Sequence, residues 1–401
     1  MSSDPGWCGV AGGHPGSERG GTPAGFQRRT GRSGQTRPAR RFGHRFDRIE
    51  REGLALSSVS SADEGRRGQM VIEFKRALIV VAAAVFVTVS VVLAHSGRTS
   101  ARALSIGAGT PLVGHAGPVS SVAFSPNGRT LATATENGTV QLWDVRRDRL
   151  VGTLRGLVRI VDGVAFSPDG RTVGAGSRGG VVRLWDARSR RQLGGPLQAH
   201  AGSVYGVAFS PDGRILAVGS AGGTVQLWGM PGHSLIGQLD NHAGAIASVA
   251  FSPDGRILAA ANTRGTVVLW DVQSRRPLGV PLQTHHLVNS VAYSGDGRTL
   301  AAGNGDNGTV GLWDVQSHHL IRTLHSGNSG PVNSVVFAPH EPILASGSET
   351  GTVQLWSLAR DKLLATLNGG TGPVFGVAFS PDGRTLAAGG FDGTTVWRGI
   401  G

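Results

Sequence analysis

Cysteine is nearly absent from this 401-residue chain, in which Cys8 is the only one. A single cysteine excludes an intrachain disulfide and any zinc site built from cysteines. Lysine is also rare, with only Lys75 and Lys362, so arginine carries almost all of the positive charge. Aromatic residues make up 6% and charged residues 16% of the chain. These low fractions exclude a coiled coil or a long charged helical bundle.

Glycine is abundant instead, with 64 residues, and the wealth of Gly, Ala and Arg is typical of a GC-rich bacterial genome. The net charge of +13 divides into +6 for residues 1–76, with 14 basic and 8 acidic residues, and +7 for the rest, with 25 and 18. No arginine run lies beside aromatics as in a nucleic-acid-binding module. We therefore expect a solvated basic surface and no nucleic-acid partner.

The N-terminal segment, residues 1–69, is rich in Gly, Arg, Ser and Pro and has no persistent apolar period. This composition predicts disorder. A second interpretation stays open, in which translation begins at Met70 and the preceding residues are not made. Met70 opens a charged stretch that is typical of the start of a targeting segment.

An uncharged run of 18 residues, Ala77 to Ala94, follows that charged stretch. As a helix it would be about 27 Å long, close to the hydrocarbon thickness of a bilayer. More basic residues precede it than follow it, which predicts a cytoplasmic N-terminus and an extracytoplasmic C-terminal part. The alternative is a cleaved signal peptide ending near Val92-Leu93-Ala94, and it exports the same part of the chain.

A single pattern repeats from about residue 103 onward. Its tryptophan recurs at spacings of 42, 43, 42, 43, 43 and 41, namely Trp143, Trp185, Trp228, Trp270, Trp313, Trp356 and Trp397. A second aromatic keeps the same period, namely Phe124, Phe166, Phe209, Phe251, Tyr293, Phe337 and Phe379. Within a unit, a Val-Ala-Phe strand, a Ser-Pro-Asp-Gly turn, a Leu-Ala-x-Gly strand, a Leu-Trp strand and an outer strand follow one another. Four antiparallel strands repeated seven times predict an all-β ring of blades around a central channel.

These units resemble the WD-repeat (β-transducin-like) family over about residues 103–398. Gly114-His115 precedes the first strand, and Trp-Asp ends the third strand at Trp143-Asp144, Trp185-Asp186, Trp270-Asp271 and Trp313-Asp314. The resemblance implies a seven-bladed propeller over residues 103–400 that serves as an interaction platform without an active site. After the membrane segment, residues 95–102 would be a linker.

The chain departs from the family pattern in the network that locks each blade. That pattern asks for a His before the first strand and an Asp in the second turn. The His is in register only at His115, His200 and His242, and the turn Asp remains only at Asp392. No repeat combines the two, so we expect blades held by apolar packing and strand pairing.

The ends of the repeat region predict how the ring closes. The chain stops four residues after Trp397, so the seventh unit lacks its own outer strand. Residues 103–113 occupy the place of an outer strand just before Gly114-His115 and should complete the seventh blade.

Several patterns that can carry chemistry are explained by the repeat. Gly303–Gly308 matches G-x-G-x-x-G but lies at a repeat turn, without the helix that a dinucleotide site needs. Neighbouring histidines at 285–286 and 318–319 would point to opposite faces of a strand. No Gly-x-Ser-x-Gly elbow appears. We therefore expect no catalytic residue, no metal and no cofactor.

The surface residues that remain are those of the face carrying the loop before each first strand and the turn between strands two and three, here called the top face. The residue ahead of that turn and the second residue of each first strand should line it. Six of these positions form the predicted binding set for a polar or basic peptide: Glu136, Tyr205, Asp306, Glu349, Phe375 and Phe391.

The function predicted from the sequence is a non-catalytic, protein-binding propeller on the extracytoplasmic side of a membrane, held by a single-pass helix. Two alternatives stay open: a sensory domain that signals through that helix with a partner, and a cytoplasmic scaffold if residues 77–94 do not enter a membrane. An enzyme is disfavoured, because no catalytic constellation is present.

Overall fold

The structure, a computed structural model, describes residues 106–115, 117–199, 202–230, 232–240, 244–325, 330–370 and 372–400. The predicted disordered segment, membrane segment and linker lie outside these residues, as do His200 and His242. The chain divides into two units between Thr99 and Ser100, and every described residue belongs to the second. No helix in the described part is long and apolar enough to cross a membrane.

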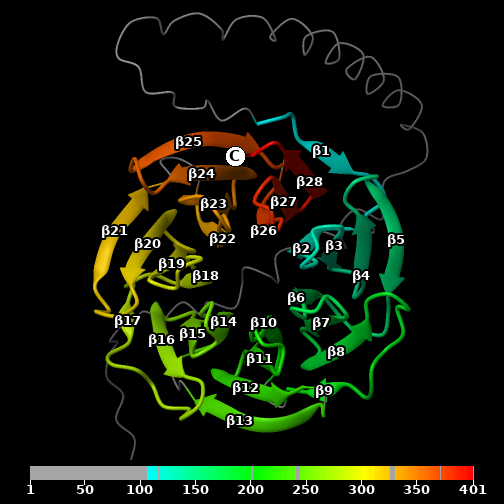
Figure 1. Cartoon of the computed structure of the whole chain (residues 1–401), viewed down its shortest axis with the longest axis horizontal. Coiled ribbons are helices and arrows are strands. Elements are labelled where there is room, and N and C mark those ends of the chain that lie inside the picture. The colour runs from blue at the N-terminus through cyan, green and yellow to red at the C-terminus, as the bar shows by residue number, and fades with distance from the viewer. Residues whose placement is uncertain are drawn as a thin grey trace, which may run out of the picture. The chain divides into compact units, whose positions relative to one another are not determined.

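Seven antiparallel sheets of four strands each surround a central axis (Figure 1). The predicted all-β, seven-bladed propeller is therefore confirmed. Blade one comprises β2–β5, each later blade takes the next four strands, and blade seven comprises β26–β28 with β1. The innermost strands are β2 (Val119–Phe124), β6 (Val161–Phe166), β10 (Val204–Phe209), β14 (Ile246–Phe251), β18 (Val288–Tyr293), β22 (Val332–Phe337) and β26 (Val374–Phe379).

The three outer positions of each blade follow in chain order. The second strands are β3 (Thr130–Thr135), β7 (Thr172–Ser177), β11 (Ile215–Ser220), β15 (Ile257–Asn262), β19 (Thr299–Asn304), β23 (Ile343–Ser348) and β27 (Thr385–Gly390). The third strands are β4 (Val140–Asp144), β8 (Val181–Asp186), β12 (Thr224–Gly229), β16 (Thr266–Asp271), β20 (Thr309–Asp314), β24 (Thr352–Ser357) and β28 (Gly393–Arg398). The outermost strands are β5 (Arg149–Leu154), β9 (Leu197–Gln198), β13 (Ser234–Asp240), β17 (Leu282–Gln283), β21 (Leu320–His325), β25 (Lys362–Asn368) and β1 (Thr110–Leu112).

Outer strands differ in length because of local sequence. In blades two and four, Gly-Gly-Pro and Gly-Val-Pro interrupt the edge strand, and only two residues remain paired in β9 and β17. Glycine and proline weaken strands and are typical of edges. The regular outer strand predicted for every repeat is therefore wrong for these two blades.

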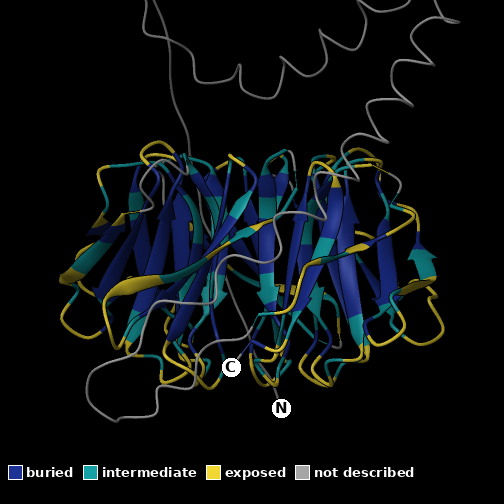
Figure 2. Ribbon diagram, turned by 90° about the horizontal axis from the view of Figure 1, so that it is seen from above, coloured by how far each residue is buried: buried dark blue, intermediate teal, exposed yellow. Residues whose placement is uncertain are grey.

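The hydrophobic core lies between blades. One cluster joins Leu142 and Leu154 of blade one to Val161 and Trp185 of blade two. Six of the seven repeat tryptophans are buried, and Trp228 is half-buried. In Figure 2, buried strands form the middle of the propeller, and exposed residues gather in the loops of its two faces and along its outer edge. Because each blade buries its faces only against neighbours, the ring has to close.

The predicted closure by the N-terminal strand is confirmed. β1 pairs with β28, with Thr110 opposite Val396 and Leu112 opposite Thr394 (cyan beside dark red in Figure 1). The strand is shorter than the predicted 103–113, although Gly107 N also donates to Arg398 O at 3.2 Å. Arg398 in turn donates to Val145 O at 2.7 Å and pairs with Asp148 of blade one.

The bottom face, opposite the top face, carries the turns between strands one and two. In five of these turns the Ser hydroxyl donates to the Asp carboxylate, as Ser167 does to Asp169 at 2.5 Å. This bond is the largest cause that lowers the pKa of each such Asp, including Asp169. The aspartates therefore serve mainly to hold their own turns.

A second bottom-face contact passes from blade to blade. The turn glycine of one blade lies against the proline of the preceding blade, so that a Cβ at Gly297 would be 3.2 Å from Pro253 Cδ. Equivalent contacts join Gly128 to Pro381, Gly170 to Pro126, Gly213 to Pro168, Gly255 to Pro211 and Gly383 to Pro339. Between blades five and six both partners differ, because Gly295 replaces the proline and Glu341 replaces the glycine.

The locking network survives partly, and only in blade one does the structure show a described histidine in it. The rings of His115 and Trp143 lie 4.5 Å apart, and His115 Nδ1 lies 3.0 Å from Gln141 Oε1. Trp143 Nε1 donates to Thr133 Oγ1 at 3.1 Å. In blade seven a Cβ at Gly370 would lie 2.8 Å from Asp392 Oδ2, so glycine stands beside the one remaining turn aspartate.

Candidate interaction face

The top face is built the same way in every blade. The residue that opens the turn between strands two and three donates its N–H to the residue just before strand one, as Glu136 does to Pro118 O at 3.0 Å and Phe391 to Pro373 O at 2.9 Å. Its side chain is therefore held beside the start of the inner strand. The two sets of positions predicted from the sequence thus share one rim.

Every inner strand begins with a bulge. The pairing register shifts between its first and third residues in all seven blades, for example between Val119 and Ser121. A bulge leaves one residue unpaired and re-aims its side chain. The re-aimed residues are all half-buried: Ser120, Asp162, Tyr205, Ala247, Asn289, Asn333 and Phe375.

Three of the re-aimed side chains bond to the next blade. Asn289 Nδ2 donates to Val332 O and Asn333 Nδ2 donates to Val374 O, each at 3.0 Å. Ser120 Oγ donates to Val161 O of blade two. Each bond reaches the first residue of the neighbouring inner strand, so these side chains fix the spacing of adjacent blades at the channel.

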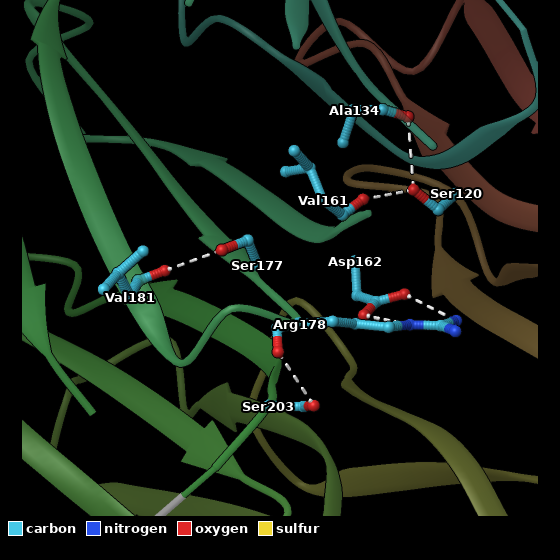
Figure 3. Close-up of polar contacts among 8 residues, drawn as sticks. All are labelled: Ser120, Ala134, Val161, Asp162, Ser177, Arg178, Val181 and Ser203. Atoms are coloured by element: carbon cyan, nitrogen blue, oxygen red, sulfur yellow. Dashed lines mark hydrogen bonds and ion pairs between the residues drawn. The ribbon is translucent and has the colours of Figure 1, made fainter. Parts of the chain in front are cut away.

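Blade two carries an ion pair instead (Figure 3). Arg178 donates to both carboxylate oxygens of Asp162, at 2.9 and 3.2 Å, and both side chains are largely buried. Burial raises the pKa of Asp162, and the bonds from Arg178 oppose that rise. Burial likewise raises the pKa of Glu136, against the charge of Arg178. Glu136 of blade one thus belongs to a cluster with this pair.

Blades five and six present the other predicted acids, each with a partner. Asp306 is exposed, and its Oδ1 lies 3.2 Å from His286 Nδ1. Glu349 is half-buried, and its Oε2 accepts a bond from Asn333 Nδ2 at 3.0 Å. Because Asn333 also bonds to blade seven, Glu349 is held at the seam between blades six and seven.

The turn of blade five is one residue longer than the others. Here Gly305, and not Asp306, donates its N–H to the residue before strand one, Leu287 O, at 2.7 Å. A Cβ at Gly305 would lie 2.3 Å from Asn289 Nδ2, so a side chain there would displace the bond of Asn289 to blade six. Asp306 accordingly lies at the tip of the turn, one position beyond the register that the sequence suggests.

The aromatic part of the predicted set is on blade seven. Phe391 is 51% exposed and is the only exposed aromatic among the described residues. Its ring lies against Gly372, where a Cβ would be 3.1 Å from Phe391 Cγ. Phe375, the re-aimed residue of β26, is half-buried at the same rim. Both rings belong to blade seven, which adjoins the blade that carries Glu349.

The predicted binding residues therefore fall into two groups. Asp306, Glu349, Phe375 and Phe391 lie along blades five to seven, whereas Glu136 and Tyr205 lie on blades one and three, on either side of the Asp162–Arg178 pair. The sequence did not single out that pair or the asparagines, although their place in the repeat was known. The sequence signal that could have revealed them is the change of residue type, from one repeat to the next, at the second position of the inner strand.

The other patterns take ordinary roles. Gly303–Gly308 connects strand β19 to strand β20. His318 Nδ1 lies 3.0 Å from Val280 O of the preceding blade, and His286 is the partner of Asp306. No group of three or more metal-ligating side chains is found within the described residues.

The seven four-stranded sheets define a seven-bladed propeller. The WD40 family (WD domain, G-beta repeat) matches seven stretches that together exceed half of the chain: 109–144, 149–186, 191–229, 233–271, 276–314, 319–357 and 361–396. The chain therefore belongs to the WD40 repeat family. Propellers of this family typically act as scaffolds for protein interactions.

Two curated relatives are similar to short parts of the chain. The rice protein "Small ribosomal subunit protein RACK1y" (Oryza sativa subsp. japonica) is 42% identical over 72 residues, which is 18% of this chain and 21% of that protein. The "WD repeat-containing protein SL1-17" of Schistosoma mansoni is 46% identical over 56 residues, or 14% and 19% of the two chains. The matches span about a fifth of each relative's length. Both organisms are eukaryotes, and a bacterial origin stays a prediction from composition.

Proposed function

We propose that this propeller is a non-catalytic platform that binds an extended segment of a partner protein across the top of blades five to seven. The observation that carries this proposal is Phe391, a half-exposed ring on the same blade as Phe375. Aromatic anchors ringed by polar groups are typical of binding hot spots. Glu349 and Asp306 at the same rim favour a segment with basic or hydrogen-bond-donating side chains.

The rim is also pre-organised. Asn333 holds Glu349 and at the same time bonds to the inner strand that carries Phe375. A side chain that is already fixed loses little conformational entropy on binding. The same hydrogen bonds therefore fix the spacing of the blades and hold the rim side chains in place before a partner binds.

We further propose that the platform is displayed on the extracytoplasmic side of a membrane by residues 77–94. The support is the uncharged length of that run and the basic residues before it. A sensory role through the same helix, and a cytoplasmic scaffold, remain the alternatives. Arginines at Val85 and Val89 should each cost ~2.5–3.5 kcal/mol at mid-bilayer and move the protein to the soluble fraction. Unchanged membrane recovery of the variant would mean that residues 77–94 are not the anchor. Recovery of the wild type in the soluble fraction would favour the cytoplasmic alternative.

The binding proposal is tested by affinity capture with the full chain, comparing the wild type with Phe391→Ser and Phe375→Ser. The matched control is Val280→Ser, which alters a residue that is 71% exposed on the outer side of blade four. The recovery of proteins that bind at this rim should fall about tenfold or more with the phenylalanine variants and should not change with the control. Equal recovery from all three variants would contradict binding at this rim.

A further inference from the structure

The bottom rim of blades one and two concentrates exposed arginines. They lie in the hairpins between strands three and four, and we call Arg146, Arg149, Arg188 and Arg191 with Leu150 and Val151 the basic rim patch. All six residues are exposed. The two hairpins are neighbours, because Arg190 Nη1 donates to Val151 O across the seam.

The acids of the two hairpins make their closest contacts with other groups. Asp144 pairs with Arg147 at 2.9 Å, and Asp148 pairs with Arg398. Asp186 accepts a bond from Ser189 N at 2.6 Å, and Arg188 is the one patch arginine whose charge acts on Asp186. Within the described residues none of the four patch arginines forms an ion pair, so their charges face solvent.

The patch is apolar as well as basic. Leu150 is 41% and Val151 is 38% exposed, at the start of β5 and directly beside Arg149. Aliphatic side chains among basic ones are typical of surfaces that lie at the headgroup region of a bilayer. A nucleic-acid site would favour aromatic groups in such places.

The chain also enters the propeller beside this patch. Gly107 bonds to Arg398 O, and the guanidinium of Arg398 bonds to Val145 O in the blade-one hairpin. The predicted membrane segment ends at Ala94, and the eleven residues 95–105 can extend no more than about 40 Å. A tether of this length would keep the bottom rim of blade one within reach of the bilayer.

We propose that the basic rim patch contacts the anionic lipid headgroups of a bilayer, with Leu150 and Val151 entering the headgroup region. The setting rests on the proposed display at a membrane. The contact would direct the bottom face toward the lipid and leave the top rim of Phe391 free for a partner. Each arginine at an anionic surface strengthens binding about fivefold at low salt, and the effect declines within a Debye length as salt is added.

The test uses the full chain and vesicles of two compositions, phosphatidylcholine alone and phosphatidylcholine with about 30% phosphatidylglycerol. Flotation on phosphatidylcholine alone reports the membrane segment. Contact between the patch and the lipid is measured separately, as the rate at which a bulky, impermeant thiol reagent labels Arg188→Cys in a Cys8→Ser background. We expect labelling to be at least severalfold slower on the anionic vesicles, and a cysteine at Arg155 on the top face to label equally on both.

Charge-matched variants identify the groups responsible. Arg146→Gln, Arg149→Gln and Arg191→Gln together should abolish the slower labelling. The control removes the same charge from exposed arginines of the top face, with Arg155→Gln, Arg159→Gln and Arg264→Gln, and should keep it. Equal labelling on both vesicles, or equal loss in both triple variants, would overturn the proposal.

Failure of the membrane segment gives a different result. The chain would then not float on phosphatidylcholine vesicles. Lipid binding by the patch would still be measured as flotation on the anionic vesicles, which the patch variant should lose and the control variant should keep. Binding of single-stranded RNA without any binding to anionic vesicles would assign the patch to nucleic acid and overturn the proposal.

Discussion

Blades one and five have the same four-stranded backbone but differ in how their buried polar groups are paired. In blade one Trp143 donates to Thr133 and His115 Nδ1 is paired with Gln141, so that among the described residues His115 Nε2 alone is buried without a partner beside this blade. In blade five Trp313 Nε1, Tyr293 Oη and Asn304 Oδ1 are buried with no hydrogen-bond partner in the described residues. The residue equivalent to Thr133 is Ala302, and Tyr293 stands where all six other repeats have Phe.

The difference shows that strand pairing and apolar packing suffice to build a blade. A buried polar group left without a partner costs about 1–3 kcal/mol. Blade five can carry such costs only because its neighbours supply a continuous core, which joins Leu312 and Leu324 to Phe337 and Trp356 of blade six. We expect blade five to open more readily than blade one, and amides of β19 and β20 to exchange faster than those of β3 and β4.

The largest effect should come from opening the ring at the seam between blades seven and one. Deleting residues 106–113 removes β1, including buried Leu112 and the Ile106 contact with the core of blade seven. At ~1.5–3 kcal/mol for each large apolar side chain, the loss is a large part of a domain's ~5–15 kcal/mol. The deleted protein should aggregate or unfold at a much lower denaturant concentration. An unchanged unfolding midpoint would contradict closure by β1.

The second-largest effect should come from removing the hydrogen bond of Trp143 in blade one. Thr133→Val keeps the shape but leaves Trp143 Nε1 buried without an acceptor. We expect a loss of ~1–3 kcal/mol in the free energy of unfolding, measured with denaturant. Thr133→Ser keeps the hydroxyl and serves as the control. Equal losses from both variants would show that packing, not the hydrogen bond, matters at this position.

A third effect depends on pH. Burial lowers the pKa of His115 to about 4, although the bond with Gln141 opposes the shift. The unfolded chain, with an ordinary value near 6.5, binds the proton first, so stability is present above that value and is lost as pH falls toward 4. Between pH 7 and pH 4.5 the wild type should lose ~1–2 kcal/mol more than His115→Gln. The exposed His319→Gln variant should follow the wild type, and an identical loss in all three proteins would exclude His115 as the source.

The smallest effect repairs blade five. Ala302→Ser offers Trp313 Nε1 the acceptor that Ser346 gives Trp356 at 3.1 Å. One new buried hydrogen bond should add ~0.5–1.5 kcal/mol to the free energy of unfolding. Ala301→Ser, on the neighbouring residue of β19, is the control and should not stabilise. A loss of stability with Ala302→Ser would mean that the site has no room for the hydroxyl.

Much of the fold could be predicted from the period of two aromatics. Trp143 and its six equivalents fixed the number of blades, and the missing outer strand after Trp397 predicted closure by the N-terminal segment. The shortened edges of blades two and four were not predicted, although their Gly-Pro content was visible. A period shows which residues are equivalent, and it does not show where one repeat departs from the others.

The candidate site was harder to predict from the sequence than the fold, for a related reason. Asn289 and Asn333 act through bonds to strands more than forty residues further along the chain. No local pattern reports a contact of that kind. The extra residue in the turn of blade five placed Gly305 where the repeat suggested Asp306, and only the hydrogen bond to Leu287 reveals the shift.

The glycine–proline contacts of the bottom face bear on how such a chain can be recombined. Each contact is shared by two repeats, and between blades five and six both halves have changed together. A repeat copied from blade five or blade six would bring Gly295 or Glu341 to a seam whose other half still has the usual glycine or proline. These two blades can therefore be exchanged without a mismatch only as a segment that keeps their shared seam whole.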